Sequence, residues 1–336
     1  MPAVEDDHQP LATALEQELE IDTIDPPDVG HGLTLEDGSR RLRWETGRVN
    51  RPERLPLLPP DVDPRPDIRL VAADMDGTLL DESNELPTHL WPLIRELGRR
   101  GILFCPASGR QYANLLERFR EVADDVVFIA ENGSYVVRRG AEISSNCLTQ
   151  EAAAEVVTSL RALASTGVDV GVVLCGKRSA YIERTDGPFR AEVDKYYTEL
   201  LEVGDLLAVT DDDFLKVAVF DFGSAARTTA PALEVFGATL QVVVSGEHWT
   251  DVMQPGANKG TGIRALQRAL GITAAQTMVF GDFLNDLEMM DAADYSFAMD
   301  NAHPLLRERA RYVAPSNDDN GVMRTISAVL GLPWTA

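Results

Sequence analysis

Cysteine is scarce in this 336-residue chain, which has only Cys105, Cys147 and Cys175. Their odd number and wide spacing match neither a disulfide framework nor a zinc-binding pattern, so a reducing environment is expected. Long apolar runs are also missing, since none approaches the roughly 18 residues of a membrane-spanning helix. The first ten residues, MPAVEDDHQP, lack the basic start of a secretory signal. The sequence therefore predicts a cytoplasmic protein without a membrane partner.

Basic residues are far fewer than acidic residues. The chain has 31 Lys and Arg residues against 54 Asp and Glu residues, a formal net charge of −23. This balance disfavours binding to nucleic acid, although a local cluster of cations or a metal ion would still admit a small anionic substrate. Hydrophobic residues make up 44% and charged residues 25%, as in ordinary globular proteins. The length predicts two domains.

Residues 1–66 differ from the rest in being rich in Pro, Gly and Asp, with no sustained hydrophobic period. We expect a flexible acidic extension there, with one short amphipathic helix at residues 11–21. Residues 40–54, RRLRWETGRVNRPER, mix Arg with a Trp, a composition that suits nucleic acid. The net charge favours instead a basic segment that lies on its own acidic body or on a partner protein. The role of the extension stays open.

From residue 68 onward, short apolar runs alternate with helical patterns. Runs at residues 68–74, 102–108, 126–132 and 277–282 end in polar residues, as buried parallel strands do. Two of the intervening segments have apolar residues at helical spacing, residues 110–122 and 259–271. The pattern predicts an α/β fold with a doubly wound parallel sheet. Ligands of such sheets bind beyond the carboxyl ends of the strands.

The middle of the chain has a different pattern and predicts an inserted α+β cap at residues 136–248, with the core formed by residues 67–135 and 249–336. Helices are predicted at residues 149–166 and 189–201, and strands at 168–176, 179–184, 214–220 and 240–246. Because the insertion interrupts the core, we expect it to cover the site as a lid. Its cations Lys177, Arg178 and Lys216 either point inward or are solvated, and the sequence does not distinguish these cases.

Two groups of acidic residues follow predicted strands. Asp74 and Asp76 end the stretch VAADMD, and Asp282 and Asp286 lie in GDFLND. Aspartates at strand ends are often simple turn formers. Four carboxylates at one edge of a sheet would, however, repel each other unless a cation offsets their charge. Oxygen ligands from Asp74 and Asp282, with water and a substrate oxygen, suit Mg²⁺.

With a metal present, the carboxylates can divide the work of phosphoryl transfer. Asp74, at the rigid end of a strand, can attack as a nucleophile and form an aspartyl phosphate. Asp76 can then protonate the leaving alcohol and later deprotonate the attacking water. Gly77 lets the chain turn away without a side chain in the path.

Three further residues offer groups for a phosphoryl substrate. Thr78 and Ser108 supply hydroxyls, and Lys259, at a helix start, supplies a cation where negative charge accumulates. Each has a simpler explanation, because Ser before Gly is common in turns and Lys in a first helical turn is usually solvated. Three more residues of the same edge either touch substrate or serve as helix caps or hinges: Arg110, Glu131 and Asn132.

The four segments DMDGTLL, ASGR, NKG and GDFLND resemble, in that order, the motifs of the haloacid dehalogenase (HAD) superfamily. The ENG sequence followed by a large insertion resembles its Cof-type branch, and the likeness spans roughly residues 68–330. It implies a Rossmann-like core with a C2B cap. It also implies a Mg²⁺-dependent phosphatase that hydrolyses sugar phosphates or similar small phosphomonoesters through an aspartyl phosphate.

The resemblance also implies roles for individual residues. Asp74 would be the nucleophile and a Mg²⁺ ligand, and Asp76 would bind the ion through its backbone carbonyl. Asp282 would complete the protein ligands, and Asp286 would support these ligands from behind. The phosphate would be held by groups matching the Met75 backbone, Ser108, Gly109, Lys259 and Asn285. One departure lies beside the metal loop, where this chain has Phe283 and many members have Asn.

Three other functions compete with hydrolysis. The stretch GTGIRA at residues 260–265 matches a dinucleotide-binding pattern, but QPGANK separates it from any preceding strand and it leaves DMDGT without a role. A non-catalytic sugar-phosphate sensor would have no need of both Asp74 and Asp76. A phosphomutase would use the same residues, and the sequence does not separate it from a phosphatase.

Overall fold

The computed structural model describes residues 30–34, 43–47 and 65–333, and the chain divides into two units, Met1–Glu53 and Arg54–Ala336. In the first unit, β1 (Gly30–Thr34) and β2 (Arg43–Gly47) form an antiparallel pair. The sequence predicted one short helix and no strand in this extension, so the strand pair was not among the predictions. It was missed because GHGLT contains two glycines and no hydrophobic alternation. The helix predicted at residues 11–21 lies outside the described residues.

The core of the second unit is a five-stranded parallel sheet in the order β16-β15-β14-β3-β4. Its strands are β3 (Leu70–Ala73), β4 (Leu103–Pro106), β14 (Thr277–Gly281), β15 (Tyr295–Met299) and β16 (Tyr312–Ala314). Parallel bridges from Phe104 to Val126 and from Ala107 to Ile129 join β5 (Val127–Ala130) to the β4 edge. The predicted α/β fold is confirmed.

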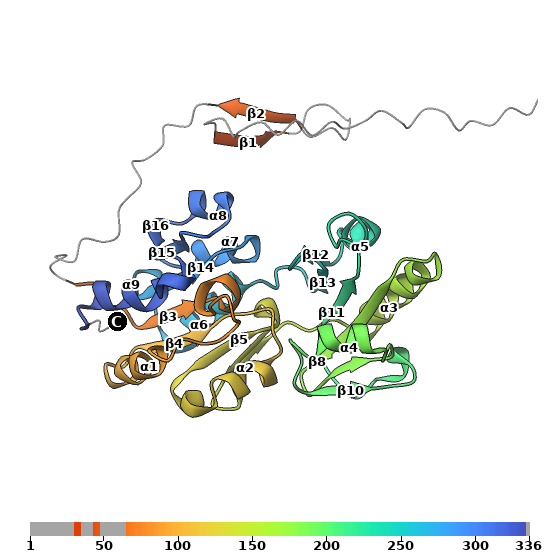
Figure 1. Cartoon of the computed structure of the whole chain (residues 1–336), viewed down its shortest axis with the longest axis horizontal. Coiled ribbons are helices and arrows are strands. Elements are labelled where there is room, and N and C mark those ends of the chain that lie inside the picture. The colour runs from red at the N-terminus through yellow and green to blue at the C-terminus, as the bar shows by residue number, and fades with distance from the viewer. Residues whose placement is uncertain (1–29, 35–42, 48–64, 334–336) are drawn as a thin grey trace, which may run out of the picture. The chain divides into compact units, whose positions relative to one another are not determined.

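Helices cover both faces of this sheet (Figure 1). They are α1 (Leu90–Arg99), α2 (Tyr112–Arg118), α6 (Lys259–Leu270), α7 (Leu287–Met290), α8 (Pro304–Arg309) and α9 (Gly321–Leu330). All four residues of β3 are fully buried, as expected for a central parallel strand that has helices on both faces. The α6 helix begins at a capping box, in which the Asn258 side chain accepts the Thr261 backbone N–H and the Thr261 hydroxyl accepts the Asn258 backbone N–H.

The inserted part is built on a six-stranded sheet in the order β10-β9-β8-β11-β13-β12. Its strands are β8 (Val170–Gly176), β9 (Ala180–Ile182), β10 (Leu200–Glu202), β11 (Phe214–Asp221), β12 (Gln241–Val244) and β13 (Trp249–Met253). Its helices are α3 (Gln150–Ser165), α4 (Gly187–Val193) and α5 (Thr229–Leu233). This is the predicted α+β architecture, and Figure 1 shows it to one side of the parallel sheet.

One predicted helix of the insertion is wrong in length. The sequence predicts a helix over residues 189–201, whereas α4 ends at Val193 and residues 200–202 form β10, parallel to β9. The helical spacing of Phe189, Val193 and Tyr197 arises because all three side chains enter the same apolar cluster, although Tyr197 lies beyond the helix. The helical spacing therefore reflects burial of the Tyr197 side chain, and it does not mean that the helix continues to residue 197.

Sheet pairing places the borders of the insertion differently from the sequence. The strand β6 (Tyr135–Arg138) pairs with β5 on the core side, and β7 (Ala141–Ser145) pairs with β6. The β13 strand, predicted to begin the second core segment, lies between β11 and β12 of the inserted sheet. We therefore propose that the cap comprises residues 146–253.

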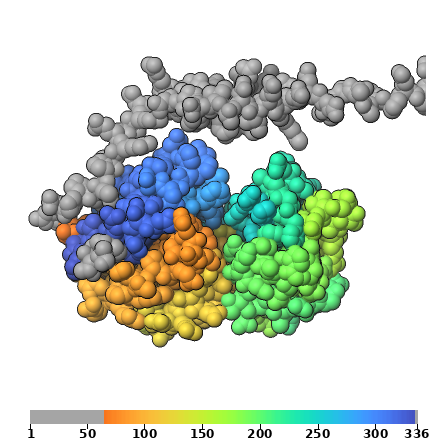
Figure 2. Space-filling model, in the orientation of Figure 1, coloured from red at the N-terminus to blue at the C-terminus, as the bar shows by residue number. Residues whose placement is uncertain are grey.

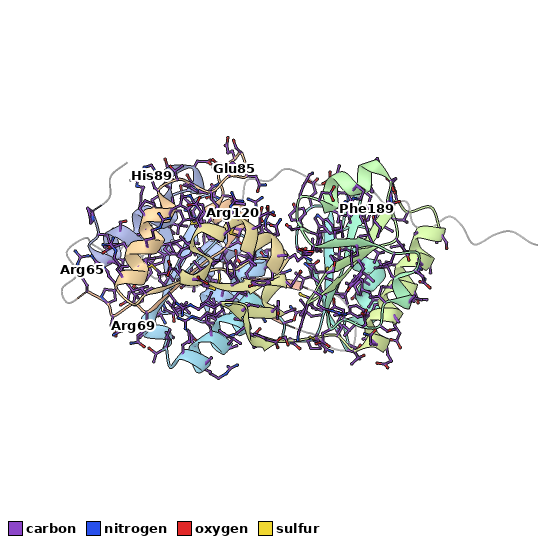
Figure 3. The ribbon with its side chains drawn as sticks, turned by 90° about the horizontal axis from the view of Figure 1, so that it is seen from below. Arg65, Arg69, Glu85, His89, Arg120 and Phe189 are labelled. Carbon is purple, nitrogen blue, oxygen red and sulfur yellow. The ribbon has the colours of Figure 1, made fainter. Side chains whose placement is uncertain are left out.

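The cap has apolar clusters of its own. Phe189, labelled in Figure 3, is fully buried in one of them, and a Cβ on Gly171 would lie 2.1 Å from its ring. The guanidinium of Arg184 lies 5.6 Å from the centre of the same ring. This packing fixes the cap as a folded body. Among the described residues, no helix combines the length and apolar character needed to cross a bilayer.

Candidate active site

A cleft of about 560 Å³ lies between the carboxyl edge of the parallel sheet and the cap. Figure 2 shows the groove between these two parts of the surface. Core residues on its wall are Asp74, Asp76, Gly77, Ser108, Gly109, Arg110, Asn132, Asp282, Phe283 and Asn285. Most of the sequence-predicted site residues are therefore in one place.

The centre of the site is a buried cluster of three carboxylates and one ammonium. Single oxygens of Asp74, Asp282 and Asp286 all lie within 4.8 Å of one another. Lys259, which has no exposed surface, donates to Asp74 and, at 2.7 Å, to Asp286 Oδ1. The first turn of α6 thus places a cation against the ends of β3 and β14.

Gly77 and Thr78 position Asp282 from the loop that follows β3. Gly77 has a φ of +76°, and a Cβ there would lie 2.3 Å from Asp282 Oδ2, so only glycine fits. The hydroxyl of Thr78 donates to Asp282 Oδ1 at 3.0 Å. Thr78, predicted to bind substrate, is buried, and its hydroxyl is hydrogen-bonded to the Asp282 carboxylate.

Asp286 stabilises the loop that carries Asp282. Its Oδ2 accepts the backbone N–H groups of Asp282 at 3.0 Å and Phe283 at 3.3 Å, while Oδ1 accepts from Lys259. A Cβ on Gly281 would lie 2.5 Å from Asp286 Oδ2. The Phe283 side chain is exposed and lies edge-on to the ring of His303. The backbone N–H of residue 283 therefore holds the loop to Asp286, while its side chain packs on His303.

The electrostatics of the cluster follow from burial and from repulsion among the acids. Burial raises the pKa of Asp74, and the nearby carboxylates add to this while Lys259 opposes it. Burial and the charge of Asp286 raise the pKa of Asp282 to about 6. Burial alone would lower the pKa of Lys259, but Asp286 and Asp74 outweigh it and the pKa rises. A further cation at these carboxylates would favour their ionised forms.

The donor set of this cluster suits a hard divalent cation. Asp74 and Asp282 present carboxylate oxygens toward the cleft, and hard oxygens are the ligands of Mg²⁺. Both oxygens of Asp286 already accept hydrogen bonds. This fits a supporting position for Asp286 behind the ligands.

The other predicted site residues lie around this cluster. Ser108 is buried, and its Oγ accepts the backbone N–H of Arg110 at 3.2 Å. Gly109 also lies on the cleft wall, and Asn285 Nδ2 donates to Asn132 Oδ1 at 3.4 Å. The Met75 side chain is buried in the core cluster, so only its backbone is available to a ligand.

The cap closes the cleft with a buried charged network. Lys216 of β11 is 2% exposed and donates to the Gly109 carbonyl at 2.9 Å. Its Nζ also lies 3.0 Å from Glu131 Oε2 and 3.3 Å from Asp251 Oδ2. Asn132 Nδ2 donates to Asp251 at 2.7 Å. Of the three cap cations left open by the sequence, only Lys216 borders the cleft. Lys177 pairs with Glu142 of β7 and with Asp213, and Arg178 pairs with Asp211 and Asp212.

Sequence reasoning missed several cap residues on the cleft wall. Tyr196, Tyr197 and Trp249 are aromatic, and Glu247 and Asp251 are acidic. Tyr196 and Trp249 lie edge to face with their centres 5.6 Å apart. No periodicity distinguishes these residues from core aromatics, because Tyr196 follows the end of α4 and Trp249 begins a strand.

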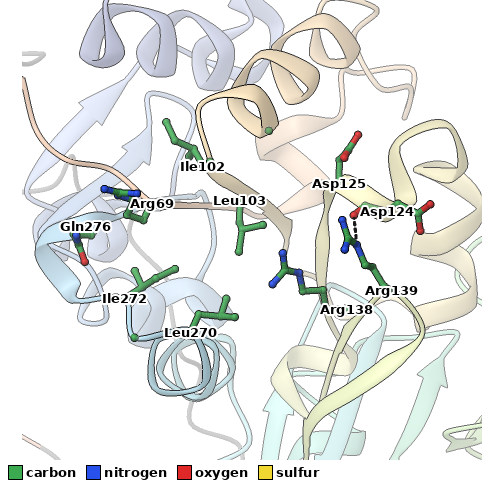
Figure 4. Close-up of a pocket in the computed structure, with 13 residues that line it drawn as sticks. Arg69, Ile102, Leu103, Asp124, Asp125, Arg138, Arg139, Leu270, Ile272 and Gln276 are labelled. Carbon is green, nitrogen blue, oxygen red and sulfur yellow. Dashed lines mark hydrogen bonds between the residues drawn. The ribbon is translucent and has the colours of Figure 1, made fainter.

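A second cleft, of about 460 Å³, lies at the opposite edge of the sheet, where Arg69 and Gln276 precede strands and Leu103 begins one (Figure 4). Its wall contains none of the sequence-predicted site residues. Arg139 donates there to the backbone carbonyl of Asp124 at 3.0 Å. The chemistry-bearing residues therefore gather at one edge only.

The glycines of GTGIRA have a packing role. A Cβ on Gly260 would lie 2.2 Å from the Glu288 carbonyl oxygen, and one on Gly262 would lie 3.0 Å from the Ile129 side chain. Both glycines allow α6 to pack closely on its neighbours. This explains the pattern without a dinucleotide.

Comparison with known proteins gives the family. Residues 71–326 match the model of the haloacid dehalogenase-like hydrolases. The chain belongs to this family. It is 35% identical over 266 residues to the 5-amino-6-(5-phospho-D-ribitylamino)uracil phosphatase YbjI of Escherichia coli strain K12, covering 78% of this chain and 96% of that one. It is 27% identical over 239 residues to the HMP-PP phosphatase of Cronobacter sakazakii, covering 71% of this chain and 86% of that one.

Solved structures share the fold of this chain. The structure of SMU.1108c from Streptococcus mutans superposes with a TM-score of 0.70 at 24% identity, covering 79% of this chain and 99% of that one. The assignment to the Cof-type HAD hydrolases, made from the four motifs, is confirmed. The predicted enzyme class, a hydrolase of phosphoric monoesters, is confirmed as well.

Proposed function

We propose that this HAD hydrolase is a Mg²⁺-dependent phosphatase that forms an aspartyl phosphate on Asp74. The observation that carries the proposal is the convergence of Asp74, Asp282 and Asp286 on one point, with Lys259 beside them. Carboxylates in such contact need a cation, and a phosphoryl group entering the cleft would bring further negative charge to the same place.

The reaction has two steps. A carboxylate oxygen of Asp74 attacks the phosphorus, and the bond from phosphorus to the ester oxygen breaks while Asp76 gives that oxygen a proton. Asp76 then takes a proton from a water molecule that attacks the phosphorus of the aspartyl phosphate. The bond to Asp74 breaks, and inorganic phosphate leaves.

The surrounding residues bind and orient the phosphoryl group. Lys259, the Ser108 hydroxyl, the Asn285 amide and the backbone N–H groups near Met75 and Gly109 supply donors. Asp74, Asp282 and the Asp76 carbonyl would hold the Mg²⁺, supported by Asp286. When bound, the ion offsets the charge of the carboxylates and of the phosphoryl oxygens.

The cap wall favours substrates whose alcohol part joins an aromatic ring to hydroxyl groups. Tyr196 and Trp249 offer ring faces or edges, and Glu247 and Asp251 offer acceptors for hydroxyl or amino groups. The E. coli relative is named for a substrate of this composition, a ribityl phosphate carried by an amino-uracil. We propose phosphorylated metabolites of this kind, with sugar phosphates as the simpler alternative.

The test is phosphate release from p-nitrophenyl phosphate and from a panel of phosphorylated metabolites, ranked by kcat/KM. Activity should require Mg²⁺, stop on addition of EDTA and be abolished in Asp74→Asn. Full activity in Asp74→Asn would refute the nucleophile. A mutase would release little phosphate and require a bisphosphate activator, and a sensor would bind sugar phosphate without turnover.

A further inference from the structure

Arg110 makes contacts that the proposed reaction does not yet use. Its side chain is 3% exposed, although Asp76, its ion-pair partner, has a side chain that is 52% exposed. The two groups meet as a fork: Arg110 Nε donates to Asp76 Oδ2 at 3.0 Å and Nη2 donates to Asp76 Oδ1. A bidentate pair of this kind fixes the plane of a carboxylate as well as its position.

The remaining donors of Arg110 go elsewhere. Nη1 donates to the Lys195 carbonyl of the cap at 3.0 Å, and Nη2 also donates to Asn84 Oδ1 at 3.1 Å. The guanidinium lies 4.9 Å from the ring centre of Tyr196, another cap residue. One buried side chain therefore joins the carboxylate of Asp76 to the segment that follows α4.

The backbone of Arg110 is held equally well. Its N–H donates to Ser108 Oγ at 3.2 Å, and its carbonyl accepts the Glu131 N–H at 3.1 Å. Because the backbone of Arg110 is fixed and its guanidinium is planar, the side chain loses little further conformational entropy when it orients Asp76.

From this geometry we infer that Arg110 is a positioning residue, which holds the Asp76 carboxylate in its reactive orientation only while the cap lies against the core. The inference rests on the proposed function, because it assigns Asp76 the proton transfers. Asp76 itself is half exposed and lies three residues beyond the end of β3, and among the described residues only Arg110 donates hydrogen bonds to its carboxylate. The Asp76 carboxylate is then oriented for proton transfer only when the cap lies against the core.

Gln111 provides a matched control from the same loop. Its Nε2 donates to the Glu199 carbonyl at 2.8 Å, and its Oε1 accepts the N–H groups of Thr198 at 3.0 Å and Glu199 at 2.9 Å. It joins the core to the same cap segment as Arg110 does, but its side-chain hydrogen bonds go to Thr198 and Glu199 and not to Asp76. Substitution of Gln111 therefore measures how much activity is lost when the cap is held less firmly and the contact between Arg110 and Asp76 is kept.

The experiment compares two esters. Asp76 must protonate a sugar alkoxide, whereas p-nitrophenolate leaves without a proton. Arg110→Met should lower kcat on ribose 5-phosphate by roughly 10- to 100-fold, part of the range for general acid–base catalysis, with a smaller change in KM and a smaller loss on p-nitrophenyl phosphate. Arg110→Lys should restore little, because an ammonium cannot form the fork. Gln111→Met should lower kcat/KM on both esters by the same factor.

A double-mutant cycle isolates the action through Asp76. In an Asp76→Ala background, Arg110→Met should change kcat by less than about 2-fold, because its target is already gone. Additive effects of the two substitutions, or equal losses on both esters, would overturn the inference.

A measurement without turnover separates this inference from the proposed function. If the wild-type protein releases no phosphate, the phosphatase proposal fails, yet the Arg110 Nε–H can still be followed by NMR. Its exchange with water should be slow in the wild type and fast in Asp76→Ala. Slow exchange in both proteins would show that Asp76 does not hold Arg110, and the inference would fall.

Discussion

Replacing Lys216 with Met should destabilise the protein more than any exposed Lys→Met substitution in the cap. The Lys216 ammonium is buried, with acceptors at 2.9, 3.0 and 3.3 Å from Gly109, Glu131 and Asp251. Glu131 and Asp251 are 1% and 2% exposed, so the substitution leaves two acids buried without their cation. Breaking a buried pair in this way typically costs about 3–5 kcal/mol.

Thermal unfolding is the assay. At roughly 2–4 °C per kcal/mol for a protein of this size class, Lys216→Met should lower Tm by on the order of 10 °C. Lys177→Met is the control, because Lys177 pairs with Glu142 and Asp213, whose side chains are 40% and 70% exposed. The Lys177 side chain is itself 19% exposed, but its acidic partners stay in contact with solvent when it is lost, so Tm should fall by a few degrees at most.

A third variant tests the cause of the loss. Burial raises the pKa of Glu131, while Lys216 opposes this shift. If the cost comes from uncompensated buried charge, adding Glu131→Gln to Lys216→Met should recover part of the lost Tm. A Tm for Lys216→Met within 2 °C of the wild type, or equal losses in Lys216→Met and Lys177→Met, would refute the reasoning.

Three further predictions concern the metal loop. Gly77→Ala should raise the Mg²⁺ concentration for half-maximal activity by roughly 10- to 100-fold, because the Cβ of the new alanine would displace Asp282. Gly98→Ala is the control and should have no effect, because the space around Gly98 is open. Phe283→Asn should leave Mg²⁺-dependent activity within about 3-fold, since the Phe283 side chain is exposed. In metal-free protein the pKa of Asp282 is raised to about 6, so this group contributes stability at low pH that is lost as pH rises through that value. The Tm increase caused by Mg²⁺ should therefore be larger at about pH 7.5 than at about pH 5, and the opposite order would contradict the assignment.

The carboxylate cluster could be predicted from sequence because it depends on one rule. Strands of a parallel sheet end at the same edge, so Asp74 after β3 and Asp282 after β14 had to lie near each other once the strands were identified. Lys259 could be predicted because it begins the helix that precedes β14. These residues need no knowledge of the cap.

Residues whose partners come from another part of the fold could not be predicted in this way. The Thr78 hydroxyl donates to Asp282, 204 positions away, a contact that no local pattern indicates. Arg110 had two open interpretations, and its fork on Asp76 became visible only with the loop folded. Trp249 was placed in the core because a strand next to the boundary has the same pattern in either sheet.

The central claim is that Asp74 accepts the phosphoryl group of the substrate. The most direct measurement quenches the enzyme during turnover with Mg²⁺ and p-nitrophenyl phosphate, reduces any acyl phosphate with borohydride, and maps the modified residue by mass spectrometry. We predict modification at residue 74 in the wild type, and neither modification nor phosphate release in Asp74→Asn. Phosphate release that continues in Asp74→Asn, or modification at another carboxylate, would contradict the account.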